Sequence, residues 1–162
     1  IMTTSLWGAS KVIAIDTNEF RLQKALEFGA TDTVVSGPNT REEVLALTDG
    51  LGVDVAMECV GYPETLQLTA SLARPRGHIA NLGVHGKPVE LPLDTMWIGN
   101  YTLTMGLVDA TSTATLLKMV ASGKLPSEKM GTHTFALNDI EEAWDVFANA
   151  AKNEAIKVVL KA

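Results

Sequence analysis

An acidic residue closes the first apolar run of this 162-residue sequence. The run Lys11–Asp16 is short and rich in β-branched residues, which is typical of a parallel strand buried on both faces. Ligands of open α/β sheets bind at the carboxyl ends of the strands, where a carboxylate can accept hydrogen bonds from ribose hydroxyls. Such a carboxylate also repels a 2′-phosphate, so Asp16 would favour NAD over NADP. The alternative is that Asp16 only caps the helix that follows.

Arg21 follows Asp16 by about one helical turn in the stretch predicted to be helical from Asn18 onwards. From there a guanidinium could reach the same ribose or the edge of an adenine. A solvated arginine on a helix face is the alternative, and the residues alone do not decide between the two.

Glycines mark the ends of two further apolar runs, Cys59-Val60-Gly61 and Leu82-Gly83-Val84. Glycine at a strand end lets a ligand approach the backbone closely. Two such ends in register would form a flat apolar slot with free carbonyls and amides, which suits a nicotinamide ring. Each end can also be a simple turn. We expect Cys59 to be a small buried residue rather than a nucleophile, because no histidine is near it in sequence.

Metal and nucleophile constellations are absent from the sequence. There is one cysteine, and the histidines His78, His85 and His133 have no zinc-ligand spacing. We therefore expect no metal ligand and no catalytic residue in this chain. Lys157, in the last apolar run, reads as an ordinary edge lysine on composition alone.

Short apolar runs alternate with amphipathic helical stretches along the whole chain. Predicted strands span residues 11–16, 31–35, 53–60, 78–84, 101–108 and 156–160. Thr40 begins a capping box, Pro63 suits a first helical turn, and Gly29 is placed to end a helix. Such alternation predicts an α/β fold with a doubly wound, mostly parallel sheet, Rossmann-like, forming one domain over residues 1–162.

Composition excludes several classes of protein. Hydrophobic residues make up 46% and charged residues 20%, which argues against disorder. The net charge is −6 and the basic residues are scattered, so no nucleic-acid partner is expected. No apolar run could span a bilayer, and no signal peptide is recognisable. The single cysteine fits a reducing compartment, so we expect a cytoplasmic location.

Taken together, these segments resemble the coenzyme domain and C-terminus of the medium-chain, zinc-dependent alcohol dehydrogenases. The resemblance covers nearly the whole chain. It rests on GASKVIAIDTNEFRLQKALEFGATDTVV, GVDVAMECVG, PRGHIANLGVHG, NYTLTMGLVDAT and IKVVL. The order and spacing of these blocks are more specific than any one of them.

The resemblance implies a role for each candidate residue. Asp16 matches the ribose-binding acid, and Arg21 matches the basic residue beside the adenosine. The other positions implied to contact NAD are Cys59, Val60, Gly61, Leu82, Gly83, Val84, Gly106, Leu107, Val108 and, at the pyrophosphate, Lys157. The resemblance further implies hydride transfer between NAD and an alcohol, or the matching aldehyde or ketone, with a catalytic zinc whose ligands lie in an N-terminal domain outside this chain.

The glycine loop that grips the pyrophosphate is expected upstream of Ile1. An acid of this kind lies about 20 residues after the loop, yet only 15 residues precede Asp16. Ile1–Trp7 would then be the tail of the first helix, ended by Gly8. The missing strand would be central, between the strands predicted at Lys11–Asp16 and Val53–Val60.

Two other hypotheses stay open at this point. The chain could be an interaction module that forms a homodimer or homotetramer through the sheet edge near Tyr101–Met105 and has no activity of its own. It could also be the coenzyme domain of a zinc-free quinone reductase. Those enzymes usually favour NADP and lack an acid at the position of Asp16.

Overall fold

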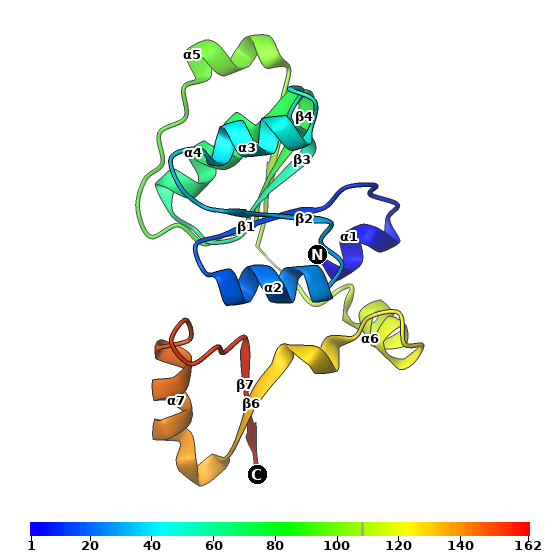
Figure 1. The fold of residues 1–162 in the computed structure, drawn as a ribbon, viewed down its shortest axis with the longest axis vertical. Coiled ribbons are helices and arrows are strands. Elements are labelled where there is room, and N and C mark those ends of the chain that lie inside the picture. Colours follow the sequence, from blue (N-terminus) through cyan, green and yellow to red (C-terminus); the bar gives the residue numbers. More distant parts are fainter. Residues whose placement is uncertain (108) are drawn as a thin grey trace. The chain divides into compact units, whose positions relative to one another are not determined.

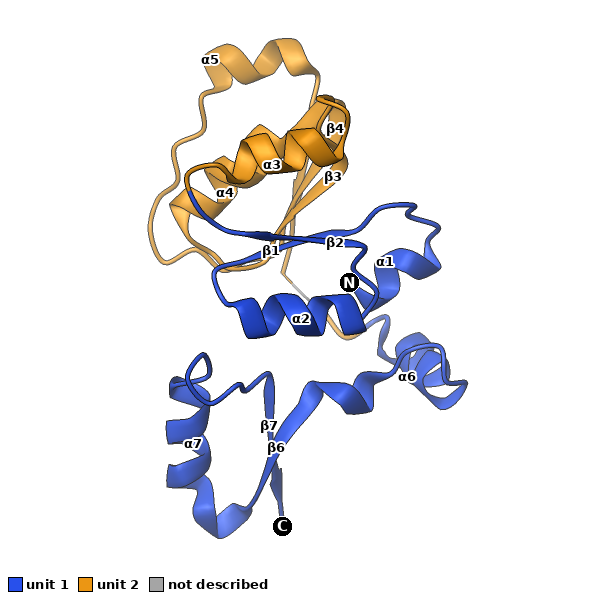
Figure 2. Ribbon diagram, viewed as in Figure 1, with its two compact units in different colours: residues 1–37, 111–162 blue, residues 38–110 orange. Residues whose placement is uncertain are grey.

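A computed structural model describes residues 1–107 and 109–162 of the chain (Figure 1). Val108, predicted at the end of the fifth strand and in the cofactor site, lies outside the described residues. The chain divides into two compact units (Figure 2). Unit 1 comprises residues 1–37 and 111–162, and unit 2 comprises residues 38–110.

Unit 2 contains a parallel sheet with the strand order β3-β4-β5. Its elements are α3 (Thr40–Leu47), β3 (Val53–Glu58), α4 (Pro63–Leu72), β4 (Ala73–Asn81), α5 (Leu93–Met96), the 3-10 turn η1 (Trp97–Gly99) and β5 (Thr102–Met105). Helix α4 connects β3 to β4 and packs against both strands. This is the βαβ connection that the alternating pattern predicts.

The core of unit 2 lies between α4 and the sheet. It consists of Ala56, Leu66, Ala70, Ala73 and the fully buried Ile79. Side chains alternate between the two faces of a strand, so Ala56 and Glu58 of β3 are buried whereas Met57 between them is exposed. A carboxylate thus points to the same side of β3 as the core.

Unit 1 contains two parallel pairs, β1-β2 and β6-β7. Its elements are α1 (Met2–Leu6), β1 (Ile13–Asp16), α2 (Glu19–Glu27), β2 (Asp32–Val35), α6 (Thr113–Ala121), η2 (Ser127–Met130), β6 (Gly131–Ala136), η3 (Leu137–Asp139), α7 (Ile140–Ala148) and β7 (Lys157–Lys161). Helix α2 packs on β1 and β2, and α7 packs on β6 and β7.

The predicted fold class is confirmed, since each pair of neighbouring strands is parallel and helices alternate with strands. The sequence also predicted several helix ends correctly. Gly29 adopts a φ of 102° just after α2, and Gly8 adopts 81° just after α1. Few residues other than glycine tolerate this left-handed backbone. Pro63 is the first residue of α4.

Some boundaries differ from the expectation. Thr40 is not the cap of α3: the cap is Asn39, and Thr40 is the first helical residue, with its side chain buried. The strand Gly131–Ala136 was not predicted. Its sequence mixes glycine, threonine and histidine, and its ladder is made with β7, more than 20 residues further along the chain. Local pattern carries little information about such a pairing.

Strands β3, β4 and β5 end before the residues expected, at Glu58, Asn81 and Met105. Cys59–Gly61, Leu82–Val84 and Gly106–Leu107 therefore belong to strand-end loops rather than to the strands. Within the described part of the chain, β1 pairs only with β2, and β3 only with β4.

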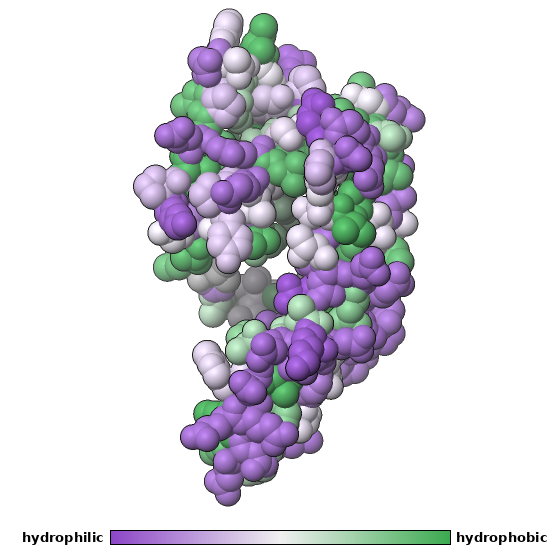
Figure 3. Space-filling model, turned by 60° about the vertical axis from the view of Figure 1, so that its left-hand side comes forward, coloured by the Kyte–Doolittle hydropathy of each residue, from purple (hydrophilic) through white to green (hydrophobic). Residues whose placement is uncertain are grey.

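Hydrophobic residues also reach the surface. On the face drawn in Figure 3 they form separate areas among hydrophilic residues. Among the exposed hydrophobic residues of unit 2 are Trp97 and Ile98, each with 72% of its surface exposed. No helix among the described residues has both the length and the apolar character needed to cross a bilayer.

Truncating the central residue of unit 2 should destabilise the fold. Ile79 is fully buried and lies in the middle of the core. We expect Ile79→Ala to lower the free energy of unfolding by about 2–5 kcal/mol, because the lost methylenes leave a cavity. Urea unfolding followed by circular dichroism measures this. Ile140→Ala, at a half-exposed position, is the control, and an equal loss in both variants would contradict the assignment of the core.

Candidate functional site

One buried carboxylate organises the carboxyl ends of the strands in unit 2. Glu58 is the last residue of β3 and is only 1% exposed. Its Oε1 accepts hydrogen bonds from the Val60 and Gly61 N–H groups, both at 2.8 Å, and from the Thr65 hydroxyl at 2.7 Å. The side chain thereby folds the loop after β3 back over the end of its own strand and ties it to the first turn of α4.

The backbone of Glu58 binds the neighbouring loop. Its carbonyl oxygen accepts hydrogen bonds from Leu82 N–H at 2.8 Å and Gly83 N–H at 3.2 Å. Four amides in two loops are therefore bound to a single residue. This corrects the expectation of a slot with free amides, because the amides of Val60, Gly61, Leu82 and Gly83 are already used.

Glycine is required where the two loops meet. Gly61 has a φ of 94°, and a Cβ there would overlap the Val84 backbone. A Cβ on Gly83 would overlap both Glu58 Oε2 and the Gly61 backbone. The glycines therefore allow the loops to approach each other, whereas the sequence suggested that they serve the approach of a ligand. Gly106 differs, since a Cβ there would meet no atom within 4 Å.

His85 lies beside the free oxygen of Glu58. The His85 Nε2 atom is 2.8 Å from Asn81 Oδ1 and 3.7 Å from Glu58 Oε2. Within the described residues, Glu58 Oε2 and His85 Nδ1 are buried without a hydrogen-bond partner. Such groups are costly in a low-dielectric interior. Glu58 and His85 are thus coupled through space, although the sequence indicated only a structural role for His85.

The hydrogen bonds of Glu58 determine its charge state. Burial alone would raise the pKa of this carboxyl, because it disfavours the charged form. Hydrogen bonds from Gly61, Thr65 and Val60, together with the His85 ring, act in the opposite direction and outweigh burial. The pKa of Glu58 is therefore lowered, and the group is a carboxylate at neutral pH.

Cys59 is exposed, which corrects the expectation that it is buried. Desolvation of the thiol, with the nearby Glu58 charge, raises the pKa of Cys59. A raised pKa disfavours the thiolate, the reactive form. The sequence argued against an activated nucleophile from the lack of a nearby histidine. In the structure, the raised pKa of the Cys59 thiol argues against it instead.

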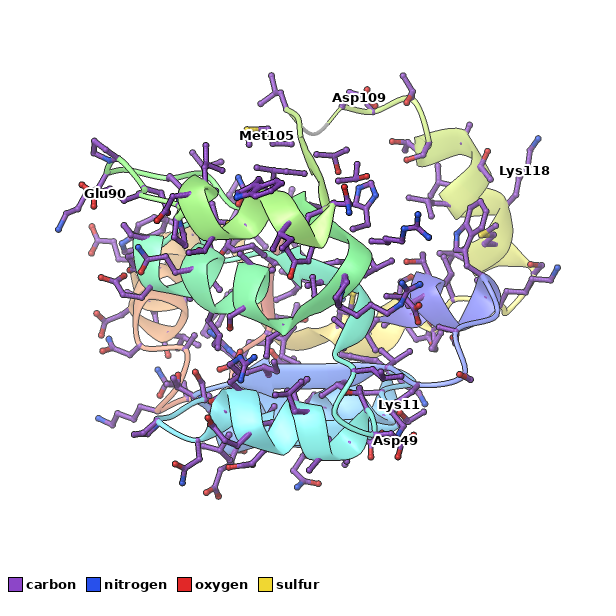
Figure 4. All side chains as sticks on the ribbon, turned by 90° about the horizontal axis from the view of Figure 1, so that it is seen from above. Lys11, Asp49, Glu90, Met105, Asp109 and Lys118 are labelled. Carbon is purple, nitrogen blue, oxygen red and sulfur yellow. The ribbon has the colours of Figure 1, made fainter. Side chains whose placement is uncertain are left out.

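A hollow of about 420 Å³ lies at the carboxyl ends of β4 and β5. Its lining consists of Asn81, Leu82, Gly83, Val84, His85, Met105, Gly106 and Leu107. Figure 4 shows Met105 at the end of β5, where the chain leaves the sheet. The walls are mainly aliphatic, with a polar corner formed by Asn81 and His85. The structure therefore brings together Leu82, Gly83 and Val84, which follow β4, with Gly106 and Leu107, which follow β5.

In unit 1 the structure brings Asp16 and Arg21 together. Asp16 is the last residue of β1, and its Oδ2 lies 3.8 Å from Arg21 Nη1. Asp16 Oδ1 accepts a hydrogen bond from Asn18 N–H at 2.9 Å. Asn18, and not Asp16, is the cap of α2, since its side chain accepts from Arg21 N–H. Asp16 therefore supports the start of α2 through the amide of the cap residue and is not itself the cap.

The Asp16 side chain stays available to a ligand. It is 31% exposed, and that of Arg21 is 47% exposed. A partly exposed pair at this separation contributes little to stability, so its geometry can be rearranged at small cost. Lys157 is the first residue of β7 and is exposed. Its expected contact with a pyrophosphate stays a prediction.

Among the described residues, no three His, Cys, Asp or Glu side chains converge in a way that could hold a metal ion. The described residues thus do not provide a ligand set for the zinc that the resemblance implies.

Sequence reasoning missed Glu58, the residue on which the strand-end loops depend. A signal was present: within the run 55–60 Glu58 is the only charged residue, and it stands three residues before Gly61 and seven before Thr65. A charged group in a buried strand requires partners. Loop amides and a helix-start hydroxyl just downstream are the nearest ones in sequence.

The fold and the strand-end groups define a class of protein. Parallel strands joined by helices, with an acid ending β1 and glycines after β3 and β4, form a Rossmann-like α/β fold. The sequence profile of the zinc-binding dehydrogenases matches residues 1–122. The chain belongs to this family.

Individual relatives agree with this assignment. An alcohol dehydrogenase from Cupriavidus necator is 32% identical over 96% of the chain and 44% of its own length. The structure of zinc-dependent alcohol dehydrogenase 2 from Streptococcus pneumonia, in its apo form, is 42% identical with a TM-score of 0.94, over 99% of this chain and 48% of that one. A dehydrogenase structure from Sinorhizobium meliloti 1021, bound to NADP, is 27% identical with a TM-score of 0.86, over 100% of this chain and 48% of that one. The chain thus spans about half the length of its relatives.

The stability conferred by Glu58 should depend on pH. The pKa of Glu58 is lowered in the folded state, whereas an unfolded glutamate has a pKa of about 4.3. The stabilisation is therefore complete above the unfolded-state pKa and is lost as the pH falls through the folded-state pKa. At pH 7 we expect Glu58→Gln to lower the free energy of unfolding by about 1–3 kcal/mol, with a smaller deficit in acid.

Denaturant unfolding between pH 7 and pH 3 measures this dependence. Glu64→Gln is the matched control, because Glu64 is an exposed carboxylate in the first turn of α4. It should stay within about 1 kcal/mol of the unmodified protein at every pH, because an exposed acid in a first helical turn contributes only about 0.3–1 kcal/mol. If the deficit of Glu58→Gln does not change with pH, the carboxylate charge is not what holds the loops.

Proposed function

We propose that this chain is the coenzyme-binding part of an NAD-dependent alcohol dehydrogenase, forming one domain over residues 1–162. The observation that carries the proposal is the position of Asp16 at the carboxyl end of β1, half-buried and with Oδ2 directed towards Arg21. Membership of the zinc-binding dehydrogenases supports the reaction class. NADP in a relative that is 27% identical supports a nicotinamide cofactor.

The described residues fit such a cofactor. The carboxylate of Asp16 would accept hydrogen bonds from the adenosine ribose, and Arg21 would lie beside the same sugar. The hollow at β4 and β5 is within the range of small-ligand sites, roughly 300–1,000 Å³. Leu82 and Val84 would flank the nicotinamide ring. Other proposed contacts are Cys59, Val60, Gly61, Gly83, Gly106, Leu107, Val108 and, at the pyrophosphate, Lys157.

When bound, the nicotinamide would accept a hydride from the carbon of a primary or secondary alcohol, or return it to an aldehyde or ketone. The residues of this chain would orient the ring and exclude water from one side of it. Leu82, Val84 and Leu107 provide aliphatic surface for this purpose. No zinc-dependent step is assigned to these residues, because we propose that the zinc ligands lie elsewhere in the whole enzyme.

The cofactor preference should depend on Asp16. In the full-length protein we expect NAD to be preferred. Asp16→Gly should raise the NADP-to-NAD ratio of kcat/KM by about 5- to 150-fold, since it removes ribose hydrogen bonds and charge repulsion worth about 1–3 kcal/mol. The substitution also frees Arg21, which lies 3.8 Å away, to meet a 2′-phosphate.

Steady-state kinetics with both cofactors provide the test. The double variant Asp16→Gly with Arg21→Gln is the informative companion, because it should lose part of the gained NADP activity. An unchanged preference in Asp16→Gly would refute the assignment of the ribose site.

We further propose that the free edge of β5 pairs two copies of the chain, giving a homodimer or homotetramer. All four residues of β5 are exposed, and the strand lies at one edge of its sheet. Sedimentation of the full-length protein should show a dimer or tetramer, and Leu103→Lys should reduce its size because the lysine charge would lie in the contact. Leu117→Lys, at an exposed position on α6, is the control. A monomer in all three samples would disprove the contact.

A further inference from the structure

The loops after β3 and β4 depend on Glu58 in two different ways. Its backbone carbonyl binds the Leu82 and Gly83 amides, and any residue at this position would keep that carbonyl. Its carboxylate binds the Val60 and Gly61 amides and the Thr65 hydroxyl, and only a side chain of this length that ends in an acceptor oxygen can make these contacts. The loop of residues 59–62 is therefore the part that the side chain controls.

The distance between the two loops allows little variation. Cβ atoms on Gly61 or Gly83 would overlap the opposite loop, so the two loops are in direct contact. The second oxygen of Glu58, Oε2, lies in this contact region and faces His85 at 3.7 Å. A displacement of the carboxylate would therefore be transmitted to Gly83 and His85, which both line the hollow.

We propose that Glu58 is a positioning residue for the nicotinamide half of the cofactor: its buried carboxylate fixes the 59–62 loop against Leu82–Val84 and so sets the shape of the hollow. The inference rests on the proposed function. Glu58 itself would not touch the cofactor, because its side chain is buried. It acts through the backbone of the residues that it binds.

The effect should be confined to one half of the cofactor. Each hydrogen bond of Glu58 described above is made within residues 58–83, whereas the Asp16–Arg21 pair that would bind the adenosine ribose is built by β1 and α2. ADP-ribose, which is the cofactor without its nicotinamide ring, should therefore bind normally when Glu58 is replaced.

Glu58→Gln tests the carboxylate with little change of shape. The amide keeps one acceptor oxygen but loses the charge, and hydrogen bonds to a charged acceptor are about twice as strong as those to a neutral one. The new NH2 group would also sit near His85 or Gly83, where Oε2 lies now. Thr65→Val is a second variant that keeps the carboxylate. It removes the hydroxyl that donates to Glu58 Oε1 and that also accepts a hydrogen bond from the Tyr62 N–H at the start of α4.

The experiment measures the binding of NADH and of ADP-ribose to the full-length protein by calorimetry. Glu58→Gln should weaken NADH by about 5- to 30-fold, the equivalent of losing one or two hydrogen bonds, while ADP-ribose changes less than twofold. Thr65→Val should weaken NADH in the same direction by a smaller factor. Glu64→Gln, the exposed control on α4, should change neither ligand.

Each result has a defined meaning. Equal weakening of NADH and ADP-ribose in Glu58→Gln would indicate general loosening and would overturn the positioning role, as would unchanged binding of both. If Glu58→Gln does not fold, the NADH-to-ADP-ribose ratio in Thr65→Val decides in the same way. If the unmodified protein binds neither ligand, the proposed function itself fails, and the role of Glu58 fails with it. If it binds both and the variants show no selective loss, only the role of Glu58 fails.

Discussion

The buried carboxylate of Glu58 is the interaction on which the strand-end region depends. A charged group in a strand beneath a helix is unfavourable unless its hydrogen bonds are satisfied. Here Oε1 receives donors from the loop after β3 and from the first turn of α4. Because Glu58 needs these hydrogen-bond donors, it links β3, the loop after β3 and the start of α4. It also explains why β3 stops at Glu58 rather than continuing to Val60.

The glycines and the carboxylate form one arrangement rather than separate features. Gly61 and Gly83 allow the two loops to approach within a distance that any Cβ would prevent, and Glu58 supplies hydrogen bonds that hold them there. The hollow beside them is lined by residues from the ends of β4 and β5. In parallel sheets this end is where ligands bind, because the loops that follow neighbouring strands converge there.

The other half of the candidate site has a different physical character. Asp16 and Arg21 form a partly exposed ion pair, and such pairs contribute little to folding. Asp16 also holds the chain locally through the amide of Asn18. One group is thus buried and structural, and the other is accessible and suited to recognition. A buried, rigid group suits the positioning role that we propose for Glu58, and an accessible group suits the role in cofactor choice that we propose for Asp16.

The sequence by itself determined the alternation of strands and helices, the fold class, the helix ends at Gly8, Gly29 and Pro63, and the position of Asp16. These features depend on hydrophobic periodicity and on backbone preferences, which act over a few residues. Only the tertiary structure decided where β3, β4 and β5 end, that β6 exists, that Cys59 is exposed and that Glu58 binds two loops. Each of these depends on which groups meet across strands and loops. A buried charge identifies its partners only when the chain that surrounds it is folded.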